Sequence, residues 1–382
     1  MKILYYYWGE ITKEDCVECM LELGWQAAVW SVPMKDLTED HDFKEKLRAR
    51  LKQKYDCVFS FDYFPLISET ASDMGVPYVS WIYDSPHLTL QSKTLGNPFN
   101  RVCLFDYGLA CRYRDEGFDN VDYVPLACNV RRLEKICGGN RNKSDHDVTF
   151  LGNLYSDQND FYARIGYLPE YLRGYLDALM LAQEQLYGID LPSEMISDEL
   201  CAEISKYVRA ELGDAYRPSG NEIFRNMVRK KITVNERKNI LKALGSRFNV
   251  DLYSQQKPPA DVHVRYMGYA DYLDAMPRIF ASSRINLNVS LRSILTGIPL
   301  RVIDVLGAGG FVMSNYQTEF SEYFVNGQDI VWYDSVENLI DKTAYYLQHD
   351  DERNRIADAG HVKACELFTY ERLLPCVMDG IG

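Results

Sequence analysis

Long apolar runs are the first thing that this sequence lacks. Its 382 residues contain no stretch approaching the roughly 20 apolar residues that a membrane-spanning helix requires. The short apolar run after Lys2 meets Glu10, so it is too short for a signal-peptide core and predicts a strand instead. We therefore expect no transmembrane segment and a cytoplasmic location.

Positive charge is scarce as well. Lys and Arg total 42 against 55 acidic residues, and the formal net charge is -13. Such a chain lacks the uniform positive field that draws proteins to nucleic acid or to anionic membranes, so no nucleic-acid partner is expected. A single nucleotide can still bind through main-chain amides and individual arginines, and that class of ligand stays open.

Motifs for metals and dinucleotides are missing too. Cys16 and Cys19 form the only C-x-x-C, and no second cysteine pair follows at the spacing of a zinc site. Asp145-His-Asp147 matches an Asp-x-Asp metal pattern, but it lies in an expected linker and we interpret it as coincidence. No G-x-G-x-x-G follows an expected first strand, which disfavours a dehydrogenase. We expect neither a metal nor a cofactor.

What is present is a regular alternation of strands and helices. Apolar runs of strand length are separated by amphipathic or charged helical segments, which predicts parallel sheets with helices on both faces. A chain of this length favours two domains. The expected strands are 3–7, 25–30, 57–61, 78–82, 101–105, 147–151, 248–253, 263–267, 285–289, 311–314 and 330–332. The predicted architecture is α/β, with two Rossmann-like domains facing one another.

Composition also predicts domain boundaries. Residues 1–130 form the first domain, a charged and glycine-containing stretch over 131–147 is the linker, and residues 147–370 form the second domain. Strand patterns disappear over 157–235, where leucines at helical spacing and several tyrosines predict a helical insertion. Thr233 and Glu236 form a capping box for a new helix that stops at Gly245, and a tail helix occupies 371–382.

The segment from Ser293 to Asn315 carries the clearest signal for chemistry. Thr296 is a candidate cap for a helix with Pro299 in its first turn, and Gly309 and Gly310 end that helix before a strand. A helix N-terminus after a strand binds anions through its free amides, so Gly297 is a candidate ligand of a phosphate.

Two charged residues extend this site. Arg301 lies in or near the first turn and is a candidate ligand of a diphosphate. Asp304 stands among apolar residues and must have a partner, because an unpaired buried carboxylate costs several kcal/mol. It either pairs with Arg301 or accepts hydrogen bonds from ribose hydroxyls.

Further donor-site candidates follow from sheet geometry, because ligands bind at the carboxyl ends of parallel strands. A plain turn is the alternative for Gly152-Asn153, and core packing is the alternative for the two tyrosines. The candidates are Gly152, Asn153, Tyr253, Gly268, Tyr269, Asn288, Ser290 and Arg292, together with Gly309 and Gly310 at the end of the expected helix.

A catalytic base is expected in the first domain. Asp84 and His87 follow the strand 78–82, so they lie near its carboxyl edge and either can take a proton from an acceptor hydroxyl. The alternatives are a turn built by Asp84 and a structural role for His87. Asp62 and Asp106 also follow strands and are the next candidates.

Several motifs together resemble a known family. The segments 283–288, 297–304, 309–311, 315–316 and 368–372 resemble the C-terminal domain of the bacterial spore-maturation-type glycosyltransferases, a branch of the GT-B group. The segments 80–87 and 105–106 resemble the N-terminal domain fused to it. The resemblance covers most of the chain apart from the helical insert, and it implies the GT-B fold and transfer of a sugar from a nucleotide.

The same resemblance bears on Asp304. In the wider relatives a Glu that contacts the sugar is followed, after seven residues, by a Glu that contacts the ribose. Asp304 matches the second position, which favours its role as a ribose ligand, whereas the first position is Thr296. The missing acid removes one reason to expect retention of the anomeric configuration, and we predict inversion.

The expected function is that of a hexosyltransferase (EC 2.4) that moves a sugar from a nucleoside-diphosphate donor, expected to be UDP-linked, to a hydroxyl of a protein or glycan. The alternatives are a catalytically silent nucleotide-sugar-binding partner in a glycosylation complex, or a nucleotide-sugar epimerase or hydrolase. The tyrosine-rich insert is expected to recognise the acceptor or a partner, or to act as structural support. The oligomeric state stays open.

Overall fold

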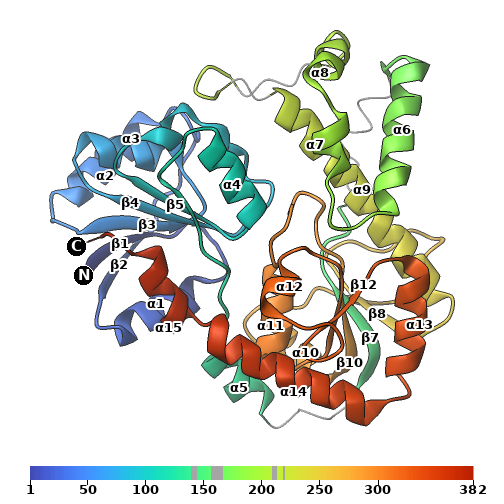
Figure 1. Ribbon diagram of the computed structural model, residues 1–382. Coiled ribbons are helices and arrows are strands. Elements are labelled where there is room, and N and C mark those ends of the chain that lie inside the picture. The colour runs from blue at the N-terminus through green and yellow to red at the C-terminus, as the bar shows by residue number, and fades with distance from the viewer. Residues whose placement is uncertain (139–143, 156–166, 209–212, 218–219, 382) are drawn as a thin grey trace. The chain divides into compact units, whose positions relative to one another are not determined.

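The computed structural model describes residues 1–138, 144–155, 167–208, 213–217 and 220–381 (Figure 1). These residues form two compact units, each built on a parallel six-stranded sheet. The first unit contains Met1–Cys128 together with residues 213–217 and 368–381, and the second contains the remaining described residues. The α/β prediction of two parallel-sheet domains is confirmed.

The first sheet has the strand order β2-β1-β3-β4-β5-β6. β3 and β4 are buried along their whole length, as the uninterrupted apolar runs of central parallel strands require. The sequence prediction missed β6, which has only three residues. The strands are β1 Lys2–Tyr6, β2 Gln26–Trp30, β3 Cys57–Phe61, β4 Tyr78–Ile82, β5 Asn100–Leu104 and β6 Val121–Tyr123.

Helices cover both faces of this sheet, with α1 and α15 packed together on one face and α2 and α3 packed together on the other (Figure 1). Asp40 and Asp106 cap α2 and α4 by accepting hydrogen bonds from main-chain N–H groups in the first turn. The helices are α1 Lys13–Glu22, α2 His41–Leu51, α3 Pro65–Asp73, α4 Tyr107–Asp115 and α15 Tyr370–Val377, with short 3-10 turns at Leu88–Gln91 and Lys93–Gly96.

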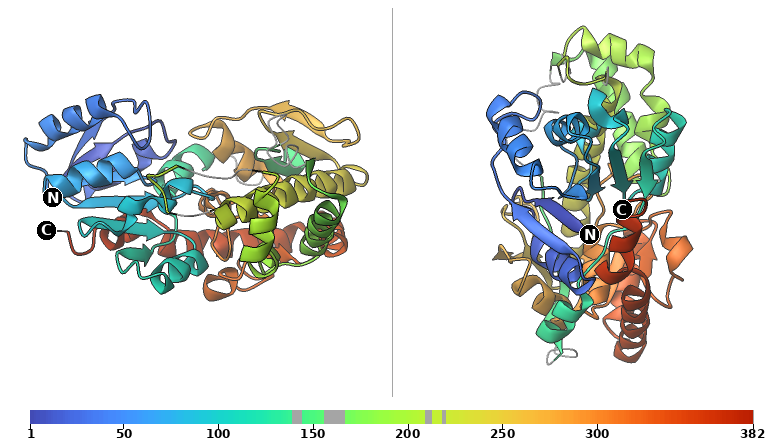
Figure 2. Two further views of the ribbon diagram at one scale, coloured as in Figure 1. Left: turned by 90° about the horizontal axis from the view of Figure 1, so that it is seen from above. Right: turned by 90° about the vertical axis from the view of Figure 1, so that its left-hand side faces the viewer.

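The C-terminal helix α15 belongs to the first unit although it follows the second in the chain. Figure 2 shows it in red beside the blue elements from two further directions. The side chain of Arg101 on β5 donates hydrogen bonds to the carbonyl oxygens of Cys376 and Val377, and Trp81 meets Tyr370 edge to face. What the sequence presented as a tail is therefore part of the first core.

The second sheet has the order β12-β11-β10-β7-β8-β9. Strands β7 to β9 are added toward one edge and β10 to β12 toward the other, so the strand order reverses between β7 and β10. The strands are β7 His146–Leu151, β8 Val250–Tyr253, β9 Arg265–Gly268, β10 Ser283–Asn288, β11 Val312–Asn315 and β12 Val331–Tyr333. Every strand predicted from the sequence is present within two residues at each end.

Helices α5, α10, α11 and α14 pack against one another beside this sheet, and α9 packs against α13. Their bounds are α5 Val130–Cys137, α6 Glu170–Glu184, α7 Leu191–Met195, α8 Asp198–Ser205, α9 Gly220–Gly245, α10 Ala275–Ser282, α11 Leu300–Gly307, α12 Phe320–Tyr323, α13 Val336–Tyr346 and α14 Asp350–Leu367. No helix in the described part of the chain is long and apolar enough to cross a membrane.

Two local predictions are wrong. The expected linker begins with a regular helix, α5, because the Asn129 side chain accepts a hydrogen bond from the Arg132 N–H and caps it. Thr233 does not start a helix, since α9 runs unbroken from Gly220 and the Thr233 hydroxyl donates to the carbonyl of Arg229 one turn earlier. A capping box and an interior i, i+4 hydrogen bond use the same residue types, so the pattern alone does not separate them.

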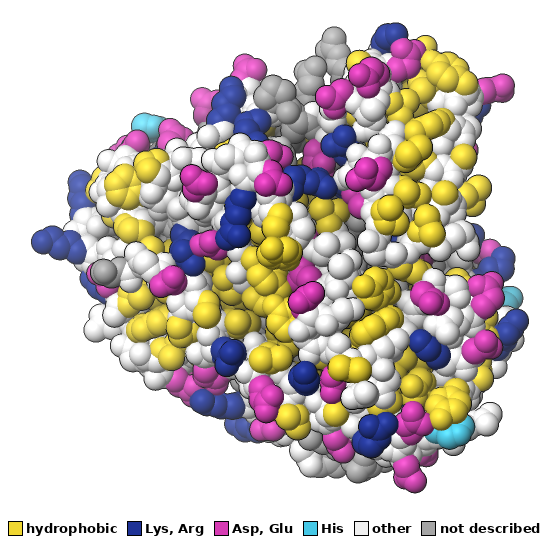
Figure 3. All heavy atoms as spheres, in the orientation of Figure 1, with side chains coloured by type: hydrophobic (Ala, Val, Ile, Leu, Met, Phe, Trp, Pro, Cys, Tyr) yellow, Lys and Arg dark blue, Asp and Glu magenta, His cyan; other side chains and the backbone are white. Residues whose placement is uncertain are grey.

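The helical insertion is present as α6 to α8 and the first turns of α9, with its own buried cluster that includes Leu172, Leu176 and Leu179. Apolar side chains also gather on its outer surface (Figure 3), among them Tyr167 and Tyr171. Residues 213–217 differ from the expected assignment to the second domain. They pack on the first unit, where Arg217 pairs with Glu116 at 2.8 Å.

Candidate functional site

Four titratable residues of the first unit gather near the carboxyl ends of β1, β3 and β4. We call Glu10, Asp62, Asp84 and His87 the acid cluster. Trp8 lies beside it, because its indole N–H donates to the carbonyl of Phe61 at 3.0 Å. The strand order reverses between β1 and β3, and ligands of such sheets bind at this switch point.

Asp62 is the most constrained member of the acid cluster. It is buried, its φ is +59°, and its Oδ1 accepts hydrogen bonds from the N–H groups of Tyr83 at 3.2 Å and Asp84 at 3.3 Å. Burial raises the pKa of its carboxyl group to about 7 despite these hydrogen bonds. A non-glycine residue in the left-handed region carries strain that is concentrated at functional sites.

Asp84, one of the two predicted bases, lies beside Asp62 and is exposed to solvent on its other side. Burial and the nearby Asp62 charge raise the pKa of Asp84 to about 6. Two carboxyl groups with displaced pKa values this close to neutrality are suited to taking up and releasing a proton.

His87, the other predicted base, is engaged by the main chain. Its Nε2 accepts a hydrogen bond from the Tyr63 N–H at 3.0 Å, and its Nδ1 lies 3.8 Å from Oδ1 of Asp62. Burial lowers the pKa of His87, so the neutral imidazole is favoured. This arrangement gives His87 a positioning role beside Asp62 and leaves Asp84 as the better placed base. Asp106, the remaining candidate, caps α4 through its Oδ1.

The second unit gathers basic residues where β7 and β10 end. We call Arg237 and Arg301 the arginine pair. Arg237 comes from α9, and its guanidinium donates to the carbonyls of Asn153 after β7 and Val289 after β10, the latter at 2.6 Å from Nη2. It therefore ties together the two strand ends at the switch point, including the predicted residue Asn153.

The surroundings of both arginines in the pair disfavour the positive charge of the guanidinium group. Arg237 is 8% exposed, and among the described residues no carboxylate lies within ion-pair distance of it. Burial lowers the pKa of both guanidinium groups, and the positive charge of Arg301 lowers that of Arg237 further. A buried and a half-buried cation that repel each other create a positive potential, which a bound anion offsets.

Arg301 lies in the first turn of α11, as predicted, with its guanidinium over the ring of Phe280 and Nη1 3.0 Å from the sulfur of Met276. The predicted cap is wrong. Pro299 precedes the helix, and the hydroxyl of Thr296 donates instead to Oε1 of Glu319 at 2.7 Å. The fold thus brings a carboxylate to the side chain that stands where the relatives carry their first Glu.

Asp304 is 2% exposed, and its Oδ1 accepts a hydrogen bond from the hydroxyl of Tyr272 at 3.1 Å. Tyr272 is a partner of this carboxylate that neither alternative named, and the negative charge of Asp304 also raises the pKa of Arg301. Tyr272 lies just before α10, beneath the guanidinium of Arg132 at 5.3 Å from its ring centre.

The polar residues after β10 form an internal network. The amide of Asn288 donates to the hydroxyls of Ser290 at 3.1 Å and Ser314 at 2.9 Å, and the Ser290 N–H donates to Oδ1 of Asn315. Asn288 and Ser290 are buried, so the network fixes the shape of the loop between β10 and α11.

The predicted donor-site residue Arg292 forms an ion pair with Glu236. Its guanidinium forms two hydrogen bonds to Glu236, at 2.9 and 3.0 Å, and Nη1 donates to the carbonyl of Leu186. This pairing does not favour the predicted contact of Arg292 with a diphosphate.

The predicted glycines have separate explanations. A Cβ on Gly152 would stand 3.2 Å from the ring of Phe150 and 3.8 Å from Arg237, which places Gly152 at the arginine pair. Gly309 has a φ of +72° after α11, and a Cβ on Gly310 would clash with the carbonyl of Phe280 at 2.6 Å. Gly297 is buried before α11.

The residues predicted on β8 and β9 lie apart from this group. The hydroxyl of Tyr253 is 3.4 Å from Nε2 of His146, the first residue of β7, so its ring extends toward the amino ends of the strands. Gly268 ends the edge strand β9, and Tyr269 after it is 61% exposed. Asp147 of the Asp-x-Asp pattern pairs with Arg284 at 3.3 Å, so this carboxylate has a structural partner.

Comparisons with known proteins agree with this geometry. Residues 229–375 match a family model described as glycosyl transferase-like, and this range holds the arginine pair, Asp304 and Glu319. No curated protein sequence matches the chain.

Solved structures are similar over nearly the whole length. A glycosyltransferase from Rickettsia africae aligns over 99% of both chains with a TM-score of 0.52 and 11% identity. Anabaena HepE in complex with UDP-glucose aligns over 99% of this chain and 98% of its own, with a TM-score of 0.55 and 10% identity. Sucrose-phosphate synthase from Thermosynechococcus elongatus covers 98% and 96%, with a TM-score of 0.54 and 9% identity.

The chain therefore has the GT-B glycosyltransferase fold and carries a glycosyl transferase-like domain in its second half. The predictions of fold and of enzyme class are confirmed at this level, whereas the match does not distinguish the spore-maturation-type branch. Four residues of the candidate site were not predicted from the sequence, namely Glu10, Arg237, Tyr272 and Glu319.

Proposed function

We propose that this protein is a glycosyltransferase that moves a sugar from a UDP-linked donor to an acceptor hydroxyl of a protein or glycan. The observation that carries the proposal is the arginine pair, in which a buried and a half-buried guanidinium group lie at the switch point of a glycosyl transferase-like domain. A diphosphate carries the charge and the oxygen acceptors that such a pair binds. The similarity to HepE in complex with UDP-glucose supports UDP as the nucleotide.

The second unit holds the donor in this proposal. The diphosphate lies at the first turn of α11, where the positive end of the helix dipole adds to the attraction of Arg301. Asp304, one turn further along α11, accepts hydrogen bonds from the ribose hydroxyls. Because the arginines supply the positive charge, binding of the diphosphate needs no divalent metal.

The first unit supplies the base. Asp84 takes the proton of the acceptor hydroxyl, and Asp62 tunes Asp84, because the nearby negative charge of Asp62 raises the pKa of Asp84. We also propose that the reaction takes place in the cytoplasm. The exposed tyrosines of the helical insertion form the surface that recognises the acceptor in this proposal.

Glu319 changes the argument about stereochemistry. Inversion was predicted because Thr296 stands in place of an acid, but the hydrogen bond from Thr296 to Glu319 brings a carboxylate to that position from the turn before α12. The absence of an acid therefore no longer supports inversion. Proton NMR of the anomeric linkage in the product reports the outcome directly.

The proposal is tested by calorimetry of UDP binding in EDTA. Asp304→Asn is expected to weaken binding by about ten- to a hundredfold, because a hydrogen bond to a charged group contributes about 1.5–3 kcal/mol. Asp84→Asn makes the same chemical change in the other unit and is expected to leave the affinity for UDP unchanged. Release of UDP from UDP-glucose distinguishes an enzyme from a silent binding partner.

Two results contradict the proposal. One is the absence of UDP binding by the wild-type protein in EDTA with recovery in Mg²⁺ or Mn²⁺, which contradicts metal-free binding. The other is an equal loss of affinity in Asp304→Asn and Asp84→Asn, which removes the assignment of the donor to the second unit. Circular dichroism of each variant confirms that it is folded.

A further inference from the structure

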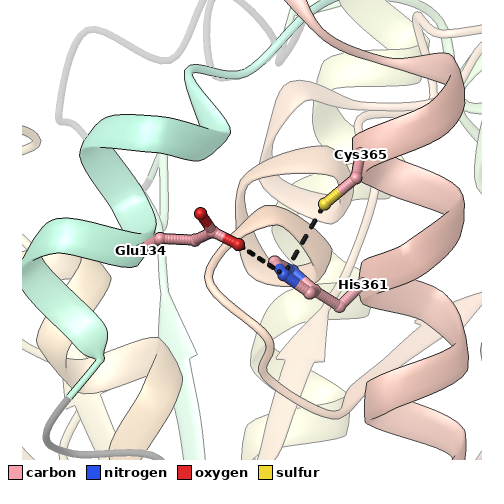
Figure 4. A group of neighbouring side chains, drawn as sticks. All are labelled: Glu134, His361 and Cys365. Atoms are coloured by element: carbon pink, nitrogen blue, oxygen red, sulfur yellow. Dashed lines mark hydrogen bonds and ion pairs between the residues drawn. The ribbon is translucent and has the colours of Figure 1, made fainter.

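Three side chains that the proposed reaction does not use converge between two helices of the second unit. Glu134 extends from α5, and His361 and Cys365 extend from α14 (Figure 4). The two residues on α14 are four positions apart and therefore share one face of that helix. One ligand atom from each of the three side chains lies within 4.8 Å of the other two.

The main chain fixes the tautomer of the histidine. Nδ1 of His361 lies 3.0 Å from the carbonyl oxygen of Leu306, the penultimate residue of α11, so Nδ1 carries the proton and donates it. The lone pair of Nε2 then points to the other side of the ring. Metal-binding histidines are usually held in this way, with one nitrogen donating to a carbonyl and the other facing the metal.

Nε2 faces two groups that it cannot satisfy together. Glu134 Oε1 lies 3.3 Å from it and Cys365 Sγ lies 3.6 Å from it (Figure 4). A neutral imidazole accepts a hydrogen bond from the thiol but presents its lone pair to the carboxylate. A protonated imidazole donates to the carboxylate but offers the thiol no acceptor. A cation placed among the three atoms satisfies all of them.

The distances fit such a cation. Zinc binds nitrogen and carboxylate oxygen at about 2.0–2.1 Å and sulfur at about 2.3 Å, in tetrahedral geometry. The corresponding edges of a tetrahedron are roughly 3.3 Å between nitrogen and oxygen and roughly 3.6 Å between nitrogen and sulfur. Both agree with the separations around Nε2.

We propose that Glu134, His361 and Cys365 form a binding site for a divalent transition metal of the zinc type, with water as the fourth ligand. Imidazole and thiolate ligands select zinc or cobalt over magnesium or calcium, which prefer oxygen. On binding, the thiol of Cys365 loses its proton to solvent and becomes the thiolate ligand, so metal affinity rises with pH.

The position of this site suggests a structural purpose. α5 is the first helix after Cys128 leaves the first unit, and α14 is the last helix before Phe368 returns to it. The Cys128 N–H donates to the carbonyl of Phe368 at 2.8 Å, so the two connecting segments lie side by side. A metal shared by α5 and α14 fixes the helices that lead into both connections, and His361 links it to the end of α11.

Cobalt titration tests the site in the full-length protein after treatment with EDTA. One equivalent of Co²⁺ is expected to give the visible bands of a tetrahedral ion and the near-ultraviolet absorption of a thiolate–cobalt bond. Cys365→Ser should abolish the thiolate absorption. Glu134→Gln removes a direct ligand and should weaken metal binding at least about a hundredfold, because the loss of an outer-shell partner alone costs up to about that factor. Cys376→Ser, at an exposed cysteine on α15, is the matched control and should change neither.

Two outcomes overturn this proposal. The first is the absence of thiolate–cobalt absorption in the folded wild-type protein, and the second is its persistence in Cys365→Ser. Circular dichroism shows whether each variant is folded, and Glu134→Gln, at a half-exposed side chain, provides a variant that is expected to fold. UDP binding measured in EDTA is independent of this site, so the metal proposal and the proposed function fail separately.

Discussion

At the scale of single residues, the candidate site depends on charges held in places that disfavour them. Asp62 in the first unit and Arg237 in the second are buried, and Arg301 is half-buried. Burial shifts the pKa of each group in the direction that favours its neutral form. Arrangements of this kind cost stability in the absence of a ligand. They are typical of sites where a proton moves or an ion binds.

The first prediction concerns the pH dependence of stability. The pKa of Asp62 rises from 3.8 to about 7 in the folded protein. Between roughly pH 4 and 7 the folded chain therefore keeps a proton that the unfolded chain has released, and stability falls as pH rises through this window. The full effect is on the order of 4 kcal/mol by pH 8.

Asp62→Asn removes this titration. Its melting temperature is expected to fall less than that of the wild-type protein between pH 5 and 8, as measured by differential scanning calorimetry. The same substitution at the exposed Asp115 is the control and should leave the pH profile unchanged. Parallel profiles for the wild-type protein and Asp62→Asn would show that the buried carboxyl group does not titrate as described.

At the scale of elements, the second unit is organised by the long helix α9. Arg237 ties it to the ends of β7 and β10, and Glu236 holds Arg292 in the loop before α11 while accepting a hydrogen bond from Tyr187 at 2.6 Å. Consecutive residues of one helix thus serve a candidate binding group and a structural ion pair.

The second prediction separates these two roles. Glu236→Ala leaves Arg292 buried without its partner and should cost about 3–5 kcal/mol of unfolding free energy. Arg292→Met removes the charge instead and, combined with Glu236→Leu, should recover part of that loss. Urea denaturation measures all three variants.

UDP affinity gives the independent measurement. If Arg292 is structural, the folded fraction of Arg292→Met binds UDP as tightly as the wild-type protein. A loss of affinity of tenfold or more without a loss of stability would instead restore Arg292 as a ligand of the diphosphate.

At the scale of the whole molecule, the chain crosses between its units more than once. α15 returns to the first unit after the second is complete, and Leu374 and Val377 are fully buried there. Helix α15 is therefore part of the core of the unit that carries the acid cluster.

The third prediction follows from this connection. Leu374→Ala should destabilise the first unit by about 2–5 kcal/mol, because it removes a fully buried side chain. Hydrogen exchange should then speed up at the amides of β4 and β5, with β10 less affected. Leu186→Ala, at an exposed leucine, is the control. Faster exchange confined to β10 would contradict the assignment of α15 to the first core.

The sequence by itself determined the fold class and nearly every strand. Those properties depend on local patterns, namely apolar runs of strand length and amphipathic helices between them, which every stretch of the chain carries within about ten residues. The helix α11 with Arg301 and Asp304 was predicted for the same reason, since α11 and its flanking glycines are contiguous.

Only the tertiary structure decided which distant groups meet. Glu319 reaches Thr296 across 23 positions, and Arg237 reaches the carbonyl of Asn153 across 84. Glu134 lies 227 positions from His361. No local pattern encodes such pairs, because folding brings them together through sheet order and helix packing. The same holds for Arg292. Its positive charge suits a phosphate ligand, but the fold pairs it with Glu236, 56 positions away.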